Sequence, residues 1–213
     1  MSSFAPFFYR NILVKDGGPI KEILVSKAII TKTNNGFEAA CSLSDAIKEN
    51  FPIETNYIYG NPDGSGSDVY KSQAIYKAIS EAIERWAFFS IANTKIGAQY
   101  GFNLDSSTNG MAAFPSFFYR NVKEIAYLES LERWALSEWW SGNLSATFGK
   151  DKQTCYIQIC FNSDIVVICW QDISDTKPIK AYGFAAGKSF KAAYEKAQIE
   201  LFRNTFVLDN FYK

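Results

Sequence analysis

Two segments of the chain carry the same charged and aromatic residues at the same spacing. Residues 81–87 read Glu-Ala-Ile-Glu-Arg-Trp-Ala, residues 129–135 read Glu-Ser-Leu-Glu-Arg-Trp-Ala, and residues 199–203 repeat the pattern more loosely as Ile-Glu-Leu-Phe-Arg. Each run follows a segment rich in Gly, Ser, Asn or Ala. Such a repeat constrains the fold before any other feature, because each copy predicts one long helix.

The spacing of apolar residues predicts the remaining elements. We expect long helices over residues 69–92 (capped by Asp68), 117–140 and 190–207, and one or two helical turns at 44–49. We expect strands at 12–14, 23–25, 37–42, 56–59, 153–160, 165–170 and 179–184, turns at 34–36 and 162–164, and irregular loops at 60–67 and 185–189.

These elements predict an α+β fold in which mixed β-sheets pack with three long, repeat-related helices. We interpret residues 1–213 as a single domain, with a β-rich N-terminal part at 1–59 and a part at 60–213 that carries the repeated motifs.

The chain contains no histidine, and its 22 basic residues balance its 22 acidic residues. The lack of histidine excludes Ser-His-Asp and Cys-His nucleophile systems and zinc sites with imidazole ligands. Catalysis would therefore use carboxylates, Arg, Lys, Tyr, or a bound metal and nucleotide. The zero net charge and the lack of a basic run argue against a nucleic-acid partner.

The cysteines and the hydropathy of the chain indicate a cytoplasmic protein. Cys41, Cys155, Cys160 and Cys169 form no Cys-x-x-Cys pair, so we interpret them as buried thiols in a reducing compartment. Residues 1–10 resemble no targeting segment, and no run approaches about eighteen apolar residues, so we expect no membrane partner.

The acidic residues of the first two helices come in pairs that share one helix face. Glu81 and Glu84 are three residues apart, and so are Glu129 and Glu132. Two such helices facing each other would gather four carboxylates around one point, where a cation must relieve their repulsion. Mg²⁺ suits such a site, because it binds hard oxygen ligands and keeps waters and substrate phosphates in its shell.

Arg85 and Arg133 follow these pairs directly and would supply forked donors for phosphate groups. Because Trp86 and Trp134 border the carboxylates, we expect at least one Glu to hold a proton more tightly than a free Glu, with the arginines opposing that shift. The alternative is a solvated helix face, the usual role of a single Glu-x-x-Glu-Arg pattern. Residues 183–189 (Gly-Phe-Ala-Ala-Gly-Lys-Ser) are one residue short of a Walker A loop, so we expect no P-loop there.

At three places the chain resembles the YcaO domain family. The resemblance rests on Gly64-Ser65-Gly66-Ser67 followed by residues 78–85, on Asn109-Gly110-Met111-Ala112-Ala113 followed by residues 129–133, and on Gly183-Phe184-Ala185 followed by residues 197–200. The three motifs appear in the order of the family and span roughly residues 60–205.

The resemblance implies an ATP- and Mg²⁺-dependent enzyme that activates a backbone amide of a peptide substrate. In this family a nucleophile adds to the amide carbonyl, ATP phosphorylates the resulting oxygen, and loss of the phosphate leaves an azoline, with thioamide and amidine variants. Such reactions modify ribosomal peptide natural products or proteins. The expected partners are the peptide substrate and a second copy in a homodimer, or a protein that presents the substrate.

The resemblance also implies site residues, although no catalytic residue. The implied nucleotide-binding residues are Glu81, Glu84, Arg85, Asn109, Glu129, Glu132, Arg133, Glu200 and Arg203. The implied metal ligands are Glu81, Glu84, Glu129, Glu132 and Glu200. Lys77 and Asn121 differ from the small hydroxyl residue and the acidic residue that are familiar at these places in the family.

An alternative from another class is a non-catalytic interaction module. In that interpretation, exposed aromatic side chains bind a peptide or another subunit. Trp139, Trp140 and residues 7–9 (Phe-Phe-Tyr) would be the contact residues.

Overall fold

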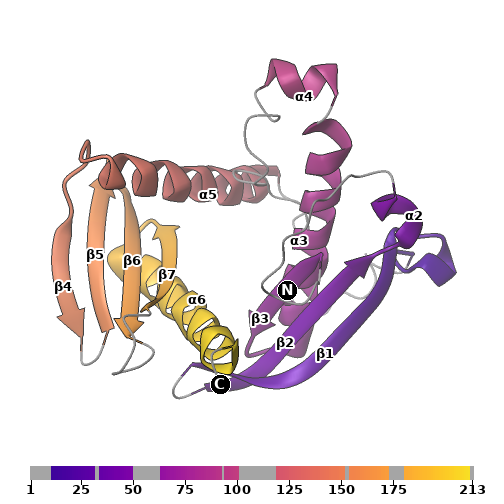
Figure 1. Ribbon diagram of the computed structural model, residues 1–213, viewed down its shortest axis with the longest axis horizontal. Helices are drawn as coiled ribbons and strands as arrows, with labels where there is room; N and C mark the ends of the chain where they lie inside the picture. Colours follow the sequence, from indigo (N-terminus) through magenta and orange to yellow (C-terminus); the bar gives the residue numbers. More distant parts are fainter. Residues whose placement is uncertain are drawn as a thin grey trace. The chain divides into compact units, whose positions relative to one another are not determined.

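The computed structural model describes residues 11–31, 34–49, 63–92, 94–100, 119–151, 154–172 and 180–211. The chain divides into two compact units, residues 1–123 and 124–213. The α+β prediction is confirmed, since each unit combines a sheet with helices (Figure 1). The prediction of a single domain over residues 1–213 stays a prediction.

The first unit contains a three-stranded antiparallel sheet of order β1-β2-β3. Its elements are η2 (Val14–Asp16), β1 (Ile20–Thr31), β2 (Asn34–Leu43), α2 (Asp45–Lys48), β3 (Gly64–Asp68), α3 (Lys71–Ala92) and α4 (Lys95–Gln99).

The second unit contains a four-stranded antiparallel sheet of order β4-β5-β6-β7. Its elements are most of α5 (Tyr119–Trp140), then β4 (Thr147–Asp151), β5 (Thr154–Phe161), β6 (Asp164–Asp172), β7 (Lys180–Gly187) and α6 (Phe190–Phe211). Both sheets are antiparallel, in place of the mixed sheets expected, because consecutive strands are neighbours.

Helix α3 packs on one face of the first sheet at very short range. The buried residues Ala74, Ala78 and Ala82 of α3 meet Ala39 and Cys41 of β2. On β3, a Cβ atom at Gly64 would overlap the carbonyl oxygen of Ala78 and the amide nitrogen of Ala82, and one at Gly66 would overlap the carbonyl oxygen of Ala74. Glycine is therefore required where the strand touches the helix backbone.

The sheet of the second unit lies between two helices. Leu131 and Ala135 of α5 pack on the face that carries Ile157, Ile159, Val166 and Ile168. Ala193, Ala197 and Leu201 of α6 pack on the opposite face, against Val167, Cys169 and Ala185. The alternation of side chains along β6 supplies both apolar faces.

The two units contain the same strand–helix module, with residue numbers that differ by 119. Helix Lys71–Ala92 corresponds to Phe190–Phe211, and both helices have 22 residues. Gly64 corresponds to Gly183, where a Cβ atom would likewise overlap a carbonyl oxygen and an amide nitrogen, those of Ala197 and Leu201. These two residues correspond to Ala78 and Ala82.

The correspondence extends to the neighbouring strands in register. Cys41 of β2 lies opposite Gly64, and Cys169 of β6 lies opposite Gly183. One strand further out, Ile23 of β1 lies opposite Cys41 and Tyr156 of β5 lies opposite Cys169. We call β1-β2-β3-α3 the first module and β5-β6-β7-α6 the second module.

The interpretation of three repeated helices therefore needs correction. Helices α3 and α6 are equivalent, although their sequences match only loosely, whereas α5 covers the other face of its sheet. In the first module, the residues of β2 and β3 that correspond to that second face are small or polar, such as Glu38, Ala40 and Ser65.

Several strand boundaries differ from those expected. The strand expected at 12–14 is reduced to an isolated bridge at Leu13, and a 3-10 turn (Val14–Asp16) begins at its last residue. Asn34–Gly36 belong to β2 instead of a turn, and Ala185–Gly187 extend β7. The expected loop at 60–67 contains most of β3, because its glycines allow the strand to approach the backbone of α3. Asp68 ends β3 and accepts from the N–H of Tyr70, just before α3.

The other expectations are met or lie outside the described residues. The helical turns at 44–49, the strands at 37–42, 153–160 and 165–170, and the turn around Asn162 (φ 53°) are present. Helix α4 and strand β4 were not expected, and the strand expected at 56–59 lies outside the described residues.

Adding a methyl group at either module glycine should destabilise the protein. Gly64→Ala and Gly183→Ala each force the edge strand away from its helix backbone, so we expect the free energy of unfolding to fall by about 1–3 kcal/mol. Ser67→Ala, on the same strand as Gly64, is the control. Urea denaturation measures the effect. Equal stability of all three variants would contradict the close contact between strand and helix at the two glycines.

Candidate functional site

The expected site residues fall on three helices in two units. Glu81, Glu84 and Arg85 lie on α3. Glu129, Glu132 and Arg133 lie on α5, and Glu200 and Arg203 lie on α6. Asn109 lies outside the described residues. The prediction that Glu81 and Glu84 face Glu129 and Glu132 across one cavity concerns both units and stays a prediction.

In the first unit, Glu81 binds the edge strand and an arginine at once. Its Oε2 accepts hydrogen bonds from the N–H of Ser65 (2.6 Å) and the hydroxyl of Ser65 (3.0 Å). Its Oε1 accepts from Arg85, one helical turn further on, at 2.7 Å. Glu81 therefore holds α3 to β3 and also fixes the direction of the Arg85 guanidinium.

In the second unit, two glutamates from different helices bind the same edge strand. Glu200 of α6 accepts from the N–H of Phe184 at 2.8 Å, and Glu132 of α5 accepts from the N–H of Ala186 at 3.1 Å. Because these N–H groups are two residues apart on β7, they point the same way. We call Glu132 and Glu200 the β7 carboxylate pair.

The β7 carboxylate pair holds protons more tightly than free glutamate. Burial, together with the charge of Glu200, raises the pKa of Glu132 to about 8. Burial also raises the pKa of Glu200, although the N–H of Phe184 and the charges of Arg203 and Arg133 oppose this shift. The prediction of at least one tightly held proton is thus confirmed, with the arginines opposing it as expected.

Arginine and aromatic side chains border the pair. The guanidinium of Arg133 lies 4.9 Å from the ring centroid of Phe184, and its charge lowers the pKa of Glu132. Glu129, one turn before Arg133, acts on Glu132 in the opposite direction. The ring centroid of Trp134 lies 4.7 Å from that of Phe161 on β5, so this ring packs on the sheet two strands away from β7. The contacts of the described residues thus place arginines and the ring of Phe184 beside the pair.

The main-chain groups that hold the glutamates were not predicted from the sequence. The N–H groups of Ser65 and Phe184 are each sixteen residues before their glutamate. The only signal was a glycine directly before each of them, Gly64 and Gly183, within a segment that reads as a loop.

The Walker-like segment is part of a different cluster. Lys188 forms an ion pair of 2.7 Å with Asp164, which is buried and also accepts from the hydroxyl of Tyr127 at 2.9 Å. Lys188 lies 5.5 Å from the ring centroid of Tyr127 as well. This cluster joins α5, β6 and the segment between β7 and α6. The lysine thus has a carboxylate partner, and the expectation that this segment is no P-loop stays a prediction.

Lys77 also has a local role. Its Nζ donates to the carbonyl oxygen of Ser67 and to Asp68. The lysine therefore ties α3 to the end of β3, close to the place where Glu81 binds the same strand.

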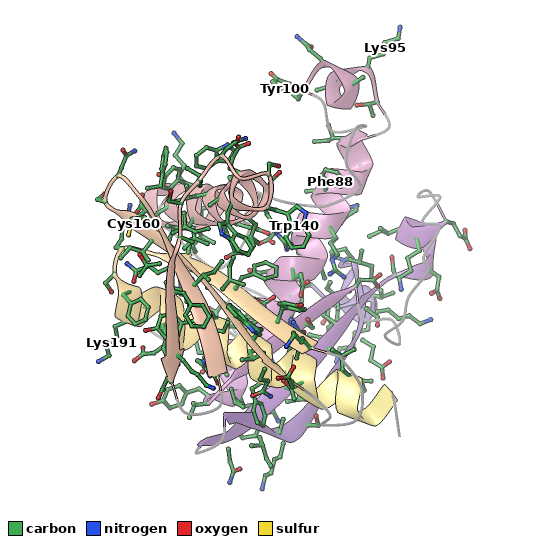
Figure 2. All side chains as sticks on the ribbon, turned by 60° about the vertical axis from the view of Figure 1, so that its left-hand side comes forward. Phe88, Lys95, Tyr100, Trp140, Cys160 and Lys191 are labelled. Atoms are coloured by element: carbon green, nitrogen blue, oxygen red, sulfur yellow. The ribbon has the colours of Figure 1, made fainter. Side chains whose placement is uncertain are left out.

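The interpretation of the cysteines as buried thiols is right for two of them and wrong for Cys160. Burial raises the pKa of Cys41 and Cys169 to about 12. Cys160 is exposed on β5 (Figure 2), one residue before the strand ends at Phe161. The side chain of Cys155 lies outside the described residues.

Two further findings concern the described residues only. None of their helices is long and apolar enough to cross a membrane. Within the same ranges, no group of three or more Cys, Asp or Glu side chains is arranged to hold a metal ion.

Comparison of the chain with known protein families, with curated proteins and with solved structures gives no match.

The raised pKa of Glu132 predicts a pH-dependent stability. Between about pH 4.5 and pH 8 the folded protein keeps a proton that the unfolded chain releases, so the stabilisation is complete below pH 4.5 and is lost as the pH rises through 8. The stability of Glu132→Gln relative to wild type should therefore increase from pH 5 to pH 8, by at most about 1.4 kcal/mol per pH unit. Urea denaturation measures this difference.

The control for this titration is Glu195→Gln, which changes an exposed carboxylate on α6. Its stability relative to wild type should stay constant over the same range. A difference between Glu132→Gln and wild type that does not change with pH would contradict the assignment.

Proposed function

We propose that the protein uses ATP and Mg²⁺ to activate a backbone amide of a peptide, as the resemblance to the YcaO family implies. The products would be azolines, thioamides or amidines in a ribosomal peptide or protein. The observation that carries the proposal is the β7 carboxylate pair (Glu132 and Glu200) with the charges of Arg133, Arg203 and Glu129 acting on it. All five residues are among those that the resemblance implies.

The donors of the second unit fit a magnesium–nucleotide complex. Mg²⁺ in nucleotide sites commonly uses one or two carboxylates and completes its shell with phosphate oxygens and waters. Glu132 and Glu200 each use Oε2 for the main chain of β7, which leaves Oε1 outside that hydrogen bond. Arg133 and Arg203 would hold the phosphate groups. The metal would supply charge neutralisation at the transferred phosphate.

Glu81 has a different role in this proposal. Both of its oxygens already accept hydrogen bonds, from Ser65 and from Arg85. We therefore treat Glu81 as a positioning residue that directs Arg85, and Glu84 keeps the metal-binding role that the resemblance implies.

The non-catalytic interaction module remains a second candidate, because one observation favours it. Trp140, at the end of α5 (Figure 2), is 84% exposed, whereas its neighbour Trp139 packs against the core. A large exposed aromatic side chain is common in binding surfaces.

Mg-ATP should raise the melting temperature if the proposal is right. A ligand that binds only the folded state stabilises it by about 2.7 kcal/mol at a hundredfold excess over Kd. Glu84→Gln and Glu132→Gln should lose this shift while keeping their fold, and Glu195→Gln should keep it. Neither a shift nor heat with millimolar Mg-ATP would favour the interaction module instead.

Binding of Mg-ATP should also release protons near pH 7. A metal ligand must be ionised, and the pKa of Glu132 near 8 means that this carboxyl is mostly protonated at pH 7. Calorimetry in buffers of different ionisation enthalpy, corrected for the protonation of ATP, measures the release. Heat that is the same in every buffer would show that Glu132 does not bind the metal.

A further inference from the structure

Strand β1 is the outer strand of the first sheet, and we call its side away from β2 the open edge because no described strand pairs there beyond Ile20. It pairs with β2 on one side (Figure 1). On the other side, the N–H of Ile20 donates to the carbonyl oxygen of Ile12, where Leu13 forms an isolated bridge with Ile20. Beyond Ile20, none of the described strands pairs with this side of β1.

The equivalent edge of the second module carries a strand. Ile23 and Val25 of β1 correspond to Tyr156 and Gln158 of β5, because each pair lies opposite corresponding residues of the next strand. In the second unit, β4 runs antiparallel along this edge, with Gly149 opposite Tyr156 and Thr147 opposite Gln158. The first unit offers the same backbone edge without a counterpart of β4 among its described residues.

The register shows which main-chain groups of β1 point outward. The N–H of Ser65 points away from β2, because it donates to Glu81. In an antiparallel pair, the main-chain N–H and C=O groups of two opposite residues point either toward each other or both away. Those of Ala40, opposite Ser65, therefore point toward β1 and pair with those of Leu24. By alternation, the N–H and C=O groups of Ile23, Val25 and Lys27 point to the open edge.

The side chains along this edge favour a peptide over a second copy of the chain. Leu24 is 58% exposed and is flanked by the exposed residues Glu22 and Ser26, so an added strand would gain apolar contact. Lys21 and Lys27 lie three residues on either side of Leu24. Antiparallel pairing of two β1 strands about Leu24 would place lysine opposite lysine, a known obstacle to pairing between identical edges.

We propose that the open edge of β1, from Glu22 to Lys27, binds an extended peptide segment as an added antiparallel strand. The main-chain groups of Ile23, Val25 and Lys27 supply the hydrogen bonds, and an acidic residue of the peptide faces Lys27. That this peptide is the substrate rests on the proposed function. That the edge binds a peptide does not depend on it.

The test uses the full chain without nucleotide, so that its result is independent of ATP binding. Random heptapeptides displayed on phage are selected for binding to the wild-type protein. The selected peptides are then synthesised, and their Kd is measured for wild type and for variants. Lys27→Pro removes an outward N–H without removing a bond to β2, and Lys27→Ala keeps that N–H. We expect Kd to be at least about tenfold higher for Lys27→Pro than for Lys27→Ala, because both variants lose the lysine charge and only Lys27→Pro loses the N–H.

Hydrogen exchange on wild type provides a second measurement that needs no variant. The amides of Ile23, Val25 and Lys27 should exchange rapidly in the free protein and slowly with a selected peptide. Failure to select any peptide, equal affinity for Lys27→Pro and Lys27→Ala, or no added protection would overturn the proposal. Protection already present without peptide would also overturn it, with concentration dependence indicating a second copy and its absence indicating a segment of the same chain.

Discussion

Each unit depends on close contact between an edge strand and the helix that follows it. Gly64 and Gly183 let the strand backbone touch the helix backbone, and small residues such as Ala78 and Ala197 meet them. The last strand of each sheet also carries N–H groups that point away from the neighbouring strand. Its outward N–H would lose water without gaining a partner, at a cost of about 1–3 kcal/mol. A glutamate one turn along the helix supplies the acceptor.

This contact explains why the strongest sequence match was structurally misleading. The Glu-x-x-Glu-Arg-Trp-Ala runs match between α3 and α5, yet α3 corresponds to α6 in its position and hydrogen bonding. Equivalence depends on glycine and alanine at the strand–helix contact and on one glutamate. Such small residues are common in any sequence, so their spacing is hard to recognise until the strand and helix are seen together.

The sequence predicted the long helices well, because their apolar residues recur at a clear helical period. The sequence did not predict the strands whose composition is unusual for a strand. The Gly-Ser run at 64–67 is typical of a loop, but its glycines belong to β3 because the helix backbone requires them. Strand β4 is almost wholly exposed and has no apolar period to reveal it. The repeated motif drew attention to Glu132, whereas its partner, the N–H of Ala186 54 residues away, could not be predicted from the sequence.

The different outer faces of the two modules bear on how a chain with two similar sheets folds without exchanging strands. Repeated units misassemble when a strand of one is accepted in place of its counterpart in the other. Here β2 in the position of β6 would place Glu38 and Ser42 where Val166 and Trp170 lie, on the face that α5 covers. Burying that carboxylate without a partner would be costly. The polarity of one sheet face thus disfavours pairing of a strand with the wrong module, although the backbones of the two modules are alike.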